Sequence, residues 1–220
     1  MSNPPPTPPS SPPVHEAAAR RDWPAYFDRI EGKPPRQTLL TALANAGEVS
    51  TESPPLAVDL GCGSGRDTLI LLEHGYKVWA QDSSQDGLQR SRARKPIQQA
   101  IDQSKAQLIQ ADFQDLAIPN ASLVNASFSL PFCPPAAFDQ LWESINDSIQ
   151  PGGRFCGQFF GDRDDWAILE DRTHLTRAKT ISLFDQYILE SFTEEDRPSE
   201  QPNQAHKHWH VFHVVARKLH

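Results

Sequence analysis

Short apolar runs and amphipathic stretches alternate along the middle of the chain. The apolar runs read as strands: LAVDL at 56–60, KVWAQD at 77–82, AQLIQAD at 106–112, SLVNASFSL at 122–130 and RFCGQFF at 154–160. Helices are expected between them, at 66–74, at 84–94, after Pro96 and at 135–150. Strands that alternate with helices predict an α/β fold with a parallel sheet covered by helices on both faces.

The end of the chain has a different pattern. Residues 186–196 and 207–218 both read as strands, and the polar loop between them has no helical periodicity. Parallel neighbours need a crossover connection, which is usually a helix. We therefore expect a doubly wound, mostly parallel sheet of about seven strands that ends in an antiparallel hairpin.

The first residues are mostly proline and serine and cannot form a packed core. We expect a disordered tail over 1–18, either inert or docking into an aromatic groove of a partner. One domain should follow over 19–220, with two helices within 19–50 and the α/β core over 54–220. Trp23 and Tyr26 recur at helical spacing in the first of these helices.

Composition excludes several classes of protein. The formal charge of −7 argues against general affinity for nucleic acid. No apolar run is long enough to cross a membrane, and the N-terminus lacks the apolar centre of a secretory signal. The three cysteines are too few and too scattered for a disulfide framework or a metal site, which favours a reducing compartment. We expect a cytoplasmic protein without a metal; its oligomeric state is open.

The candidate ligand loop is GCGSG, which joins the first strand to the next helix. Gly61, Gly63 and Gly65 allow positive φ and a close approach of another molecule to the backbone. The amides at the following helix N-terminus point outward and attract negative groups. Ligands of open α/β sheets bind at the carboxyl ends of the strands. A binding loop is therefore the preferred interpretation over a simple tight turn.

Acidic residues at the strand ends indicate the kind of ligand. The dinucleotide fingerprint G-x-G-x-x-G is incomplete, since Arg66 stands where its third glycine should be. Asp59 precedes the loop, where it suits a cation rather than a pyrophosphate. Asp82 ends the second strand, where an acid can accept hydrogen bonds from ribose hydroxyls. Asp112 and Phe113 follow the third strand and could hold an adenine. Together they indicate an adenosine that carries a cation.

At these motifs the sequence resembles the class I S-adenosylmethionine-dependent methyltransferases. VDLGCGSGRDT is similar to their first motif, the acid of AQDSS to their second and ADFQDL to their third. The resemblance runs from about Leu56 to Lys218 and implies a Rossmann-like fold. The run GCGSGRDTLILLEHGYKVWAQDSS is most similar to small-molecule methyltransferases of the tellurite-resistance and thiopurine type.

The resemblance also implies roles for individual residues. S-adenosylmethionine would be the cofactor, with its methionine part at Asp59 and the loop residues Gly61, Cys62, Gly63 and Gly65. Ser83 would assist Asp82 at the ribose, and Asp112 and Phe113 would hold the adenine. Asn125 and Ala126 would lie near the reacting methyl group. Arg36 would pair with the cofactor carboxylate, although a solvated surface arginine is equally consistent.

Candidates for the acceptor site come from three segments. Trp23 and Tyr26 would form a lid or simply pack on the sheet edge. Phe128 and Phe132 follow the fourth strand and would line an apolar pocket, unless they are ordinary core residues. The catalytic candidates are Cys133, His208 and His210. His206, His208 and His210 share one strand face and His213 the other, but no acid or cysteine is interleaved to favour a metal site.

We expect methyl transfer from S-adenosylmethionine to a small-molecule acceptor by in-line displacement. N/D-P-P-Y/F, the run typical of base methylases, is absent after the fourth strand. The alternatives are a protein methyltransferase, a nicotinamide-dependent oxidoreductase and a non-catalytic module that binds the cofactor. Acceptor loops lack a fixed motif, so the reacting atom stays open.

Overall fold

A computed structural model describes residues 14–199 and 207–220. Its strands are β1 (Leu56–Leu60), β2 (Lys77–Asp82), β3 (Ala106–Gln110), β4 (Ala121–Ala126), β5 (Ile149–Gly161), β6 (His174–Leu175), β7 (Tyr187–Pro198) and β8 (His208–Lys218). Its α-helices are α1 (Val14–Ala19), α2 (Trp23–Ile30), α3 (Gln37–Ala46), α4 (Arg66–Glu73), α5 (Gln85–Ala93), α6 (Lys95–Asp102), α7 (Pro135–Ser148) and α8 (Arg177–Ser182). The 3₁₀ turns are η1 (Phe113–Asp115), η2 (Leu130–Phe132) and η3 (Asp165–Ile168).

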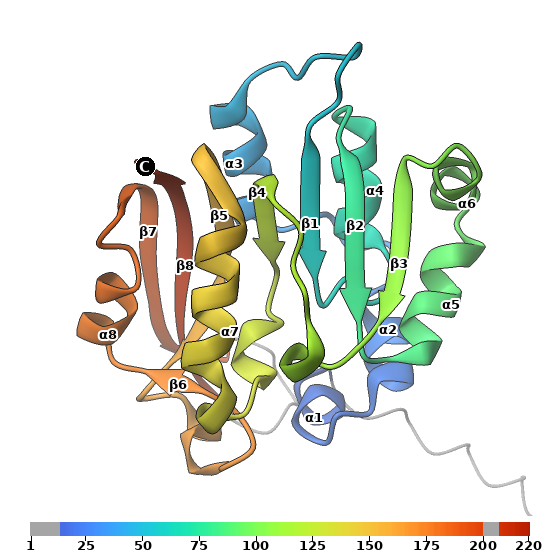
Figure 1. The fold of residues 1–220 in the computed structure, drawn as a ribbon. Helices are drawn as coiled ribbons and strands as arrows, with labels where there is room; N and C mark the ends of the chain where they lie inside the picture. The colour runs from blue at the N-terminus through green and yellow to red at the C-terminus, as the bar shows by residue number, and fades with distance from the viewer. Residues whose placement is uncertain (1–13, 200–206) are drawn as a thin grey trace, which may run out of the picture.

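The strands form one mixed sheet, in the order β3-β2-β1-β4-β5-β8-β7 (Figure 1). β1 to β5 pair in parallel, whereas β8 is antiparallel to both β5 and β7. The expected Rossmann-like sheet with a terminal antiparallel hairpin is thus confirmed. The short strand β6 pairs in parallel with β5 and was not expected, because two residues carry no readable period.

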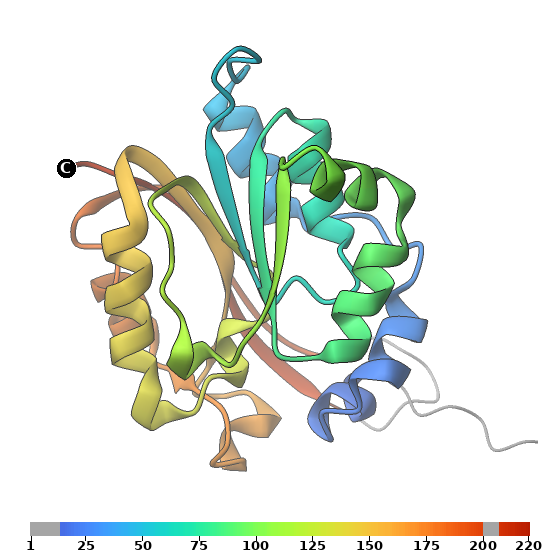
Figure 2. The same ribbon diagram turned by 45° about the vertical axis from the view of Figure 1, so that its right-hand side comes forward.

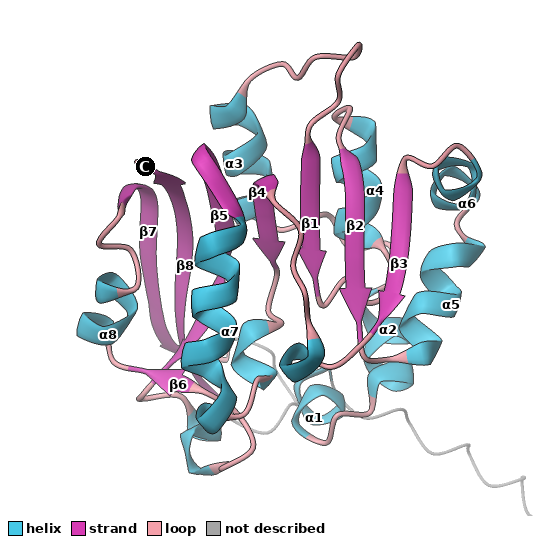
Figure 3. Ribbon diagram, in the orientation of Figure 1, coloured by secondary structure: helices cyan, strands magenta, loops and turns pink. Residues whose placement is uncertain are grey.

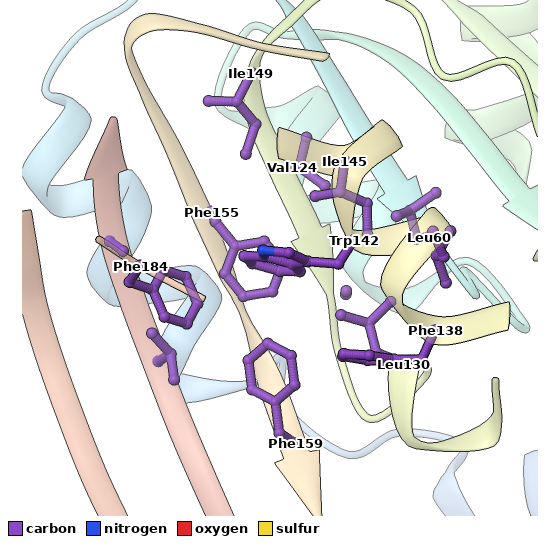
Figure 4. Close-up of a cluster of buried hydrophobic side chains, with 14 of the residues drawn as sticks. Leu60, Val124, Leu130, Phe138, Trp142, Ile145, Ile149, Phe155, Phe159 and Phe184 are labelled. Carbon is purple, nitrogen blue, oxygen red and sulfur yellow. The ribbon is translucent and has the colours of Figure 1, made fainter. Parts of the chain in front are cut away.

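Helices cover both faces of the sheet, which explains why the central strands read as continuous apolar runs. α7 crosses in front of the sheet and α3 and α4 lie behind it (Figures 1 and 3). The front core is rich in aromatic rings: Trp142 of α7 lies 5.2 Å from Phe155 and 5.1 Å from Phe184, between ring centroids (Figure 4). The core behind contains Leu39 and Leu71, from α3 and α4.

α1 and α2 lie at the end of the sheet toward which β1, β2 and β3 point, as both ribbon views show (Figures 1 and 2). The N-terminal part therefore differs from the expectation. Three helices precede β1 rather than two, and the boundary of the expected tail at residue 18 is wrong. Ala17 and Ala18 are buried, since small side chains let α1 pack closely. Residues 1–13 of that expected tail lie outside the described residues.

An ion pair behind the hairpin links β7 to β5. The register of β7 shifts between Leu189 and Ser191, which leaves Glu190 outside the ladder. Its carboxylate accepts two hydrogen bonds from Arg154, both 2.9 Å long, and one from Asn45. Burial alone would raise the pKa of Glu190, but these hydrogen bonds outweigh it and hold the pKa below its ordinary value. The pair thus stabilises the fold wherever Glu190 is ionised.

Glu190→Gln is expected to lower the free energy of unfolding by about 2–3 kcal/mol at pH 7, because it leaves the half-buried Arg154 without its charge partner. Denaturation in urea measures this, with Glu143→Gln on the exposed face of α7 as the control. Since the folded pKa of Glu190 is depressed, the difference should shrink as the pH falls below its ordinary value of 4.5. Equal stabilities at pH 7 would contradict the prediction.

Candidate active site

A cavity of about 560 Å³ opens at the carboxyl ends of the central strands. Its floor is made by the segments that follow β1, β2, β3 and β4, and residues of α2 contribute to its wall. This is the position at which open α/β sheets bind ligands. The cavity has an acidic end at β1 to β3 and an aromatic end beyond β4, described in turn below.

The acidic end centres on Asp59, which is the penultimate residue of β1 and is 1% exposed. Thr68 donates its hydroxyl proton to Asp59 Oδ2 at 2.6 Å, and Asn125 donates from Nδ2 to Oδ1 at 2.8 Å. Burial, and after it the nearby carboxylate of Asp67, raises the pKa of Asp59 to about 7. A cation in the cavity would favour the ionised form. Asp67, an acid in the first turn of α4 that is 4% exposed, was not among the expected site residues.

Asn125 and Ala126 are both fully buried at the end of β4 and are absent from the cavity wall. Asn125 lies behind Asp59 and also donates to Asp67 Oδ2 at 3.4 Å. Both residues were expected near the reacting methyl group, but neither lines the cavity; Asn125 instead holds the two acids in place.

The glycine loop has left-handed backbone at all three positions, with φ of 68° at Gly61, 52° at Gly63 and 79° at Gly65. The space that a side chain would occupy at each of these glycines is filled by other side chains of the protein and is not open to a ligand. A Cβ on Gly63 would lie 2.7 Å from Cε1 of Phe27 in α2, and one on Gly61 would collide with Ser129. Gly61, Cys62 and Gly63 line the cavity, but Gly65 does not. The loop is thus fitted to the helix above it.

Asp82 ties this loop to the end of β2. Its Oδ2 accepts from the Gly63 amide and its Oδ1 from the Ser84 amide, both at 2.7 Å. Burial raises the pKa of Asp82, while the two amide hydrogen bonds act against it. Asp82 and Ser83 line the cavity, as do Asp112 and Phe113 beyond β3. The structure therefore brings the three expected acids to one wall.

Gly63→Ala is expected to weaken ligand binding at the acidic end by about tenfold or more. An alanine is strained at the positive φ of this position, and its methyl group would displace Phe27. Gly32→Ala is the matched control, since Gly32 has φ of 72° but nothing within 4 Å of its Cβ. Gly87→Ala adds a contact of 2.9 Å to Phe27 without a positive φ. Calorimetric titration with S-adenosylhomocysteine compares the three. Equal losses in Gly63→Ala and Gly32→Ala would assign the effect to backbone strain alone.

The aromatic end is walled by rings from distant parts of the chain. The expected residues Trp23, Tyr26, Phe128 and Phe132 all line the cavity. Trp23 lies 5.0 Å from Phe132 between ring centroids. Phe160, Trp166 and Trp209 extend the wall, and the Trp166 and Trp209 centroids are 5.3 Å apart. These last three were not expected, because local patterns do not show which strand-end rings meet.

Ion pairs hold α1 and α2 over the cavity on both sides. Toward the aromatic end, Arg21 contacts Asp171 with 3.0 Å between Nε and Oδ2. Toward the acidic end, Asp28 of α2 pairs with Arg90 of α5 at 2.6 Å. Glu31 pairs with Arg94, which also donates to the Ser64 carbonyl in the loop. The N-terminal helices are therefore fixed to both halves of the site.

Arg36 precedes α3 and lines the cavity. Its guanidinium carbon lies 4.4 Å from the centroid of the Phe128 ring. Its Nε is buried and makes no hydrogen bond within the part of the chain that the structure describes. A buried donor without a partner is costly, so Arg36 is suited to binding an anionic group.

The histidine and cysteine candidates are placed away from the cavity. His210 is fully buried on the opposite face of β8, where it accepts from the Arg163 amide and contacts Glu194 at 3.0 Å. His208 lies on that same face and contacts Asp196 at 2.7 Å. Burial raises the pKa of Cys133 to about 11, which leaves its thiol protonated. His206 lies outside the described residues.

Three side chains on that face lie close enough together to bind a metal ion, but each is already paired with another group of the protein. Glu194, Asp196 and His210 place their ligand atoms within 4.8 Å of one another. Arg163 donates to both carboxylates, at 2.7 Å and 2.6 Å, and both ring nitrogens of His210 are engaged. The cluster is therefore a set of cross-strand ion pairs at the start of the hairpin.

Comparison with known proteins agrees with this geometry. Residues 57–153 match the family described as methyltransferase domain. The structure of TehB from Haemophilus influenzae superposes with a TM-score of 0.69 at 15% identity, covering 88% of this chain and 66% of TehB. A 1,6-didemethyltoxoflavin-N1-methyltransferase from Burkholderia thailandensis gives 0.63 at 18% identity, covering 98% and 94%. Residues 57–153 thus match a methyltransferase domain, and the fold of the chain is that of S-adenosylmethionine-dependent methyltransferases.

Curated relatives match over a shorter stretch. The chain is 32% identical over 99 residues to a carboxy-S-adenosyl-L-methionine synthase of Shewanella sediminis, covering 43% of this chain and 40% of the relative. The Vibrio cholerae enzyme of the same name is 30% identical over 124 residues, covering 54% and 50%. The chain thus spans half or less of the length of these relatives. The names of these two relatives contain S-adenosyl-L-methionine, and the Burkholderia structure holds S-adenosylhomocysteine, the demethylated form of that cofactor.

The residues of the cavity fit that cofactor. A sulfonium and an ammonium group are cationic, and Asp59 and Asp67 supply buried carboxyl groups. Asp82 keeps lone pairs free for ribose hydroxyls after accepting its two amide hydrogen bonds.

None of the helices in the described residues has the length and apolar character needed to cross a membrane.

Proposed function

We propose that the protein transfers a methyl group from S-adenosylmethionine to a small-molecule acceptor bound at the aromatic end of the cavity. The observation that supports this proposal is a single continuous cavity of about 560 Å³, with buried acids at one end and aromatic rings at the other. Its volume lies in the range of small-molecule sites. The Burkholderia neighbour is named for a small-molecule acceptor, which supports the same class here.

In this proposal the cofactor supplies an activated methyl group on a sulfonium, and the chain supplies position and exclusion of water. Asp59 and the loop from Gly61 to Gly63 hold the methionine part, Arg36 takes its carboxylate and Asp82 with Ser83 takes the ribose. Asp112 and Phe113 hold the adenine. α1 and α2, tied down on both sides, keep water from the reacting groups. In-line displacement gains most from such positioning.

The rival functions differ in what they predict for binding. Calorimetric titration with S-adenosylhomocysteine, and with NADH in parallel, is the deciding experiment. Micromolar binding of the first and none of the second is expected. NADH binding alone would favour an oxidoreductase, and binding of neither would overturn the proposal.

The mass of the product then separates the remaining alternatives. Incubation with S-adenosylmethionine and small-molecule pools should yield products heavier by one methylene unit. Methylation of added proteins alone would favour a protein methyltransferase. Cofactor binding with no methylated product would favour a non-catalytic module. Conversion of the cofactor itself would point instead to the chemistry named for the curated relatives.

A further inference from the structure

The aromatic end of the cavity contains a histidine–carboxylate pair that the sequence patterns did not single out. β8 presents alternate residues to its two faces, and Trp209, Val211 and His213 all line the cavity. Glu195 reaches the same wall from β7, where its neighbour on β8 is Val211. The two side chains are about a quarter exposed, at 26% and 27%, so a ligand in the cavity can reach them.

The hydrogen bond between them determines which nitrogen is available. His213 Nε2 lies 3.2 Å from Glu195 Oε2. Since a carboxylate only accepts, Nε2 carries the proton and Nδ1 keeps its lone pair. Within the described part of the chain, Nδ1 makes no hydrogen bond, and it is accessible to solvent. His213 therefore has a free proton-accepting atom and a carboxylate to stabilise it once it is charged.

The surroundings keep this imidazole neutral at physiological pH. Burial lowers the pKa of His213 below its ordinary value of 6.5; Glu195 raises it, and the positive charge of Arg36 lowers it. Glu195 is shared, because Arg197 contacts its other oxygen at 3.2 Å. A neutral imidazole beside a carboxylate is suited to accept a proton at neutral pH.

The rings at this end of the cavity form a wall that is suited to stacking against a flat ligand. Phe128 lies 6.0 Å from His213 between ring centroids, and Phe160, Trp166 and Trp209 continue the apolar wall. Cys133 is fully buried, and His208 and His210 face away from the cavity. Among the described residues, His213 is thus the histidine that lines the aromatic end of the cavity.

We propose that His213, oriented by Glu195, accepts the proton of an aromatic acceptor that carries a hydroxyl or a ring N–H, and that such protic rings are the substrate class. This rests on the proposed function. The O–H or N–H bond breaks with its electrons left on the acceptor atom, and the proton passes to Nδ1. The acceptor–methyl bond forms as the sulfur–methyl bond breaks, with that electron pair going to sulfur. The imidazolium next to Glu195 then returns its proton to water.

The first test reads the imidazole directly. In ¹H–¹⁵N spectra of the full chain with S-adenosylhomocysteine bound, His213 should show the Nε2–H tautomer and a pKa below 6.5, assigned by its loss in His213→Gln. Glu195→Gln should change the tautomer population while the cofactor still binds. A protonated ring at pH 7, or an Nδ1–H tautomer, would overturn the proposal.

The second test uses phenol, 8-hydroxyquinoline and thiophenol as acceptor probes at saturating S-adenosylmethionine. His213→Gln should lower kcat for the hydroxyl probes by at least about a hundredfold, the scale of general-base catalysis. Thiophenol ionises readily without a base, so its turnover should change little. His208→Gln, on the other face of the strand, is the matched control. For the hydroxyl probes, kcat should rise with pH to a plateau in the wild type and lose that step in the variant.

The outcomes separate the two proposals. Equal losses for hydroxyl and thiol probes, or no loss for either, would overturn the role of His213. Turnover of thiophenol alone, or of none of the probes, by a protein that binds S-adenosylhomocysteine would overturn the substrate class and leave the proposed function standing. Failure to bind S-adenosylhomocysteine would remove the proposed function itself.

Discussion

Asp82→Ala should weaken S-adenosylhomocysteine binding by about 1–3 kcal/mol, which corresponds to roughly a factor of five to more than a hundred in Kd. Two losses combine in this variant. The ribose would lose its acceptor at the end of β2, and the amides of Gly63 and Ser84 would lose the carboxylate that holds the loop. Calorimetry on the purified variant gives the affinity, and a thermal melt shows whether the fold is intact.

The ribose contribution can be separated from the loop contribution with a second ligand. S-(2′-deoxyadenosyl)homocysteine lacks one of the hydroxyls that Asp82 is proposed to bind. It should bind wild type more weakly than the natural nucleoside, and the difference should largely vanish in Asp82→Ala. Asp102→Ala, which removes an exposed acid at the end of α6, controls for net charge. Unchanged affinity in Asp82→Ala would place the ribose elsewhere in the cavity.

The strands that build the site were readable because each is a short, largely apolar run with a polar residue at or near its end. KVWAQD was expected at 77–82 and β2 has those bounds, with Asp82 as its last residue. Parallel strands bring their carboxyl ends to one edge, so acids that are far apart in sequence had to meet there. The acidic wall at Asp59, Asp82 and Asp112 follows from that topology.

The partners across the cavity could not be read in the same way. Gly63 needs its small size because Phe27 of α2 packs on it, and that contact joins two segments that share no local pattern. The face of β8 toward the cavity depends on its register with β5, which pairs His213 with Gln158. The alternation of β8 predicted that His213 lies on the opposite face from His208 and His210. It did not predict which of the two faces lies toward the cavity.

Wild-type affinity for S-adenosylhomocysteine should rise as the pH increases from about 5.5 and level off above the pKa of Asp59. Burial raises that pKa to about 7, so the carboxyl is largely neutral at pH 6. Since the ammonium group of the ligand favours the ionised form, binding releases a proton below this pKa. The affinity should therefore grow by up to about tenfold per pH unit below it. Calorimetry at pH 6, in two buffers with different ionisation enthalpies, measures the released proton.

Asp59→Asn isolates this effect because the amide fits the same contacts. Its oxygen can accept from Asn125, and the Thr68 hydroxyl can turn to accept from its NH₂ group. The variant should bind about 1.5–3 kcal/mol more weakly than wild type at pH 8, the cost of losing a charge-assisted hydrogen bond. Its affinity should also be nearly independent of pH. Repeating the wild-type series in His213→Gln controls for the other titrating group on the cavity wall. A flat wild-type profile would mean that Asp59 binds the ligand in one protonation state throughout, and its burial beside Asp67 would then serve the fold alone.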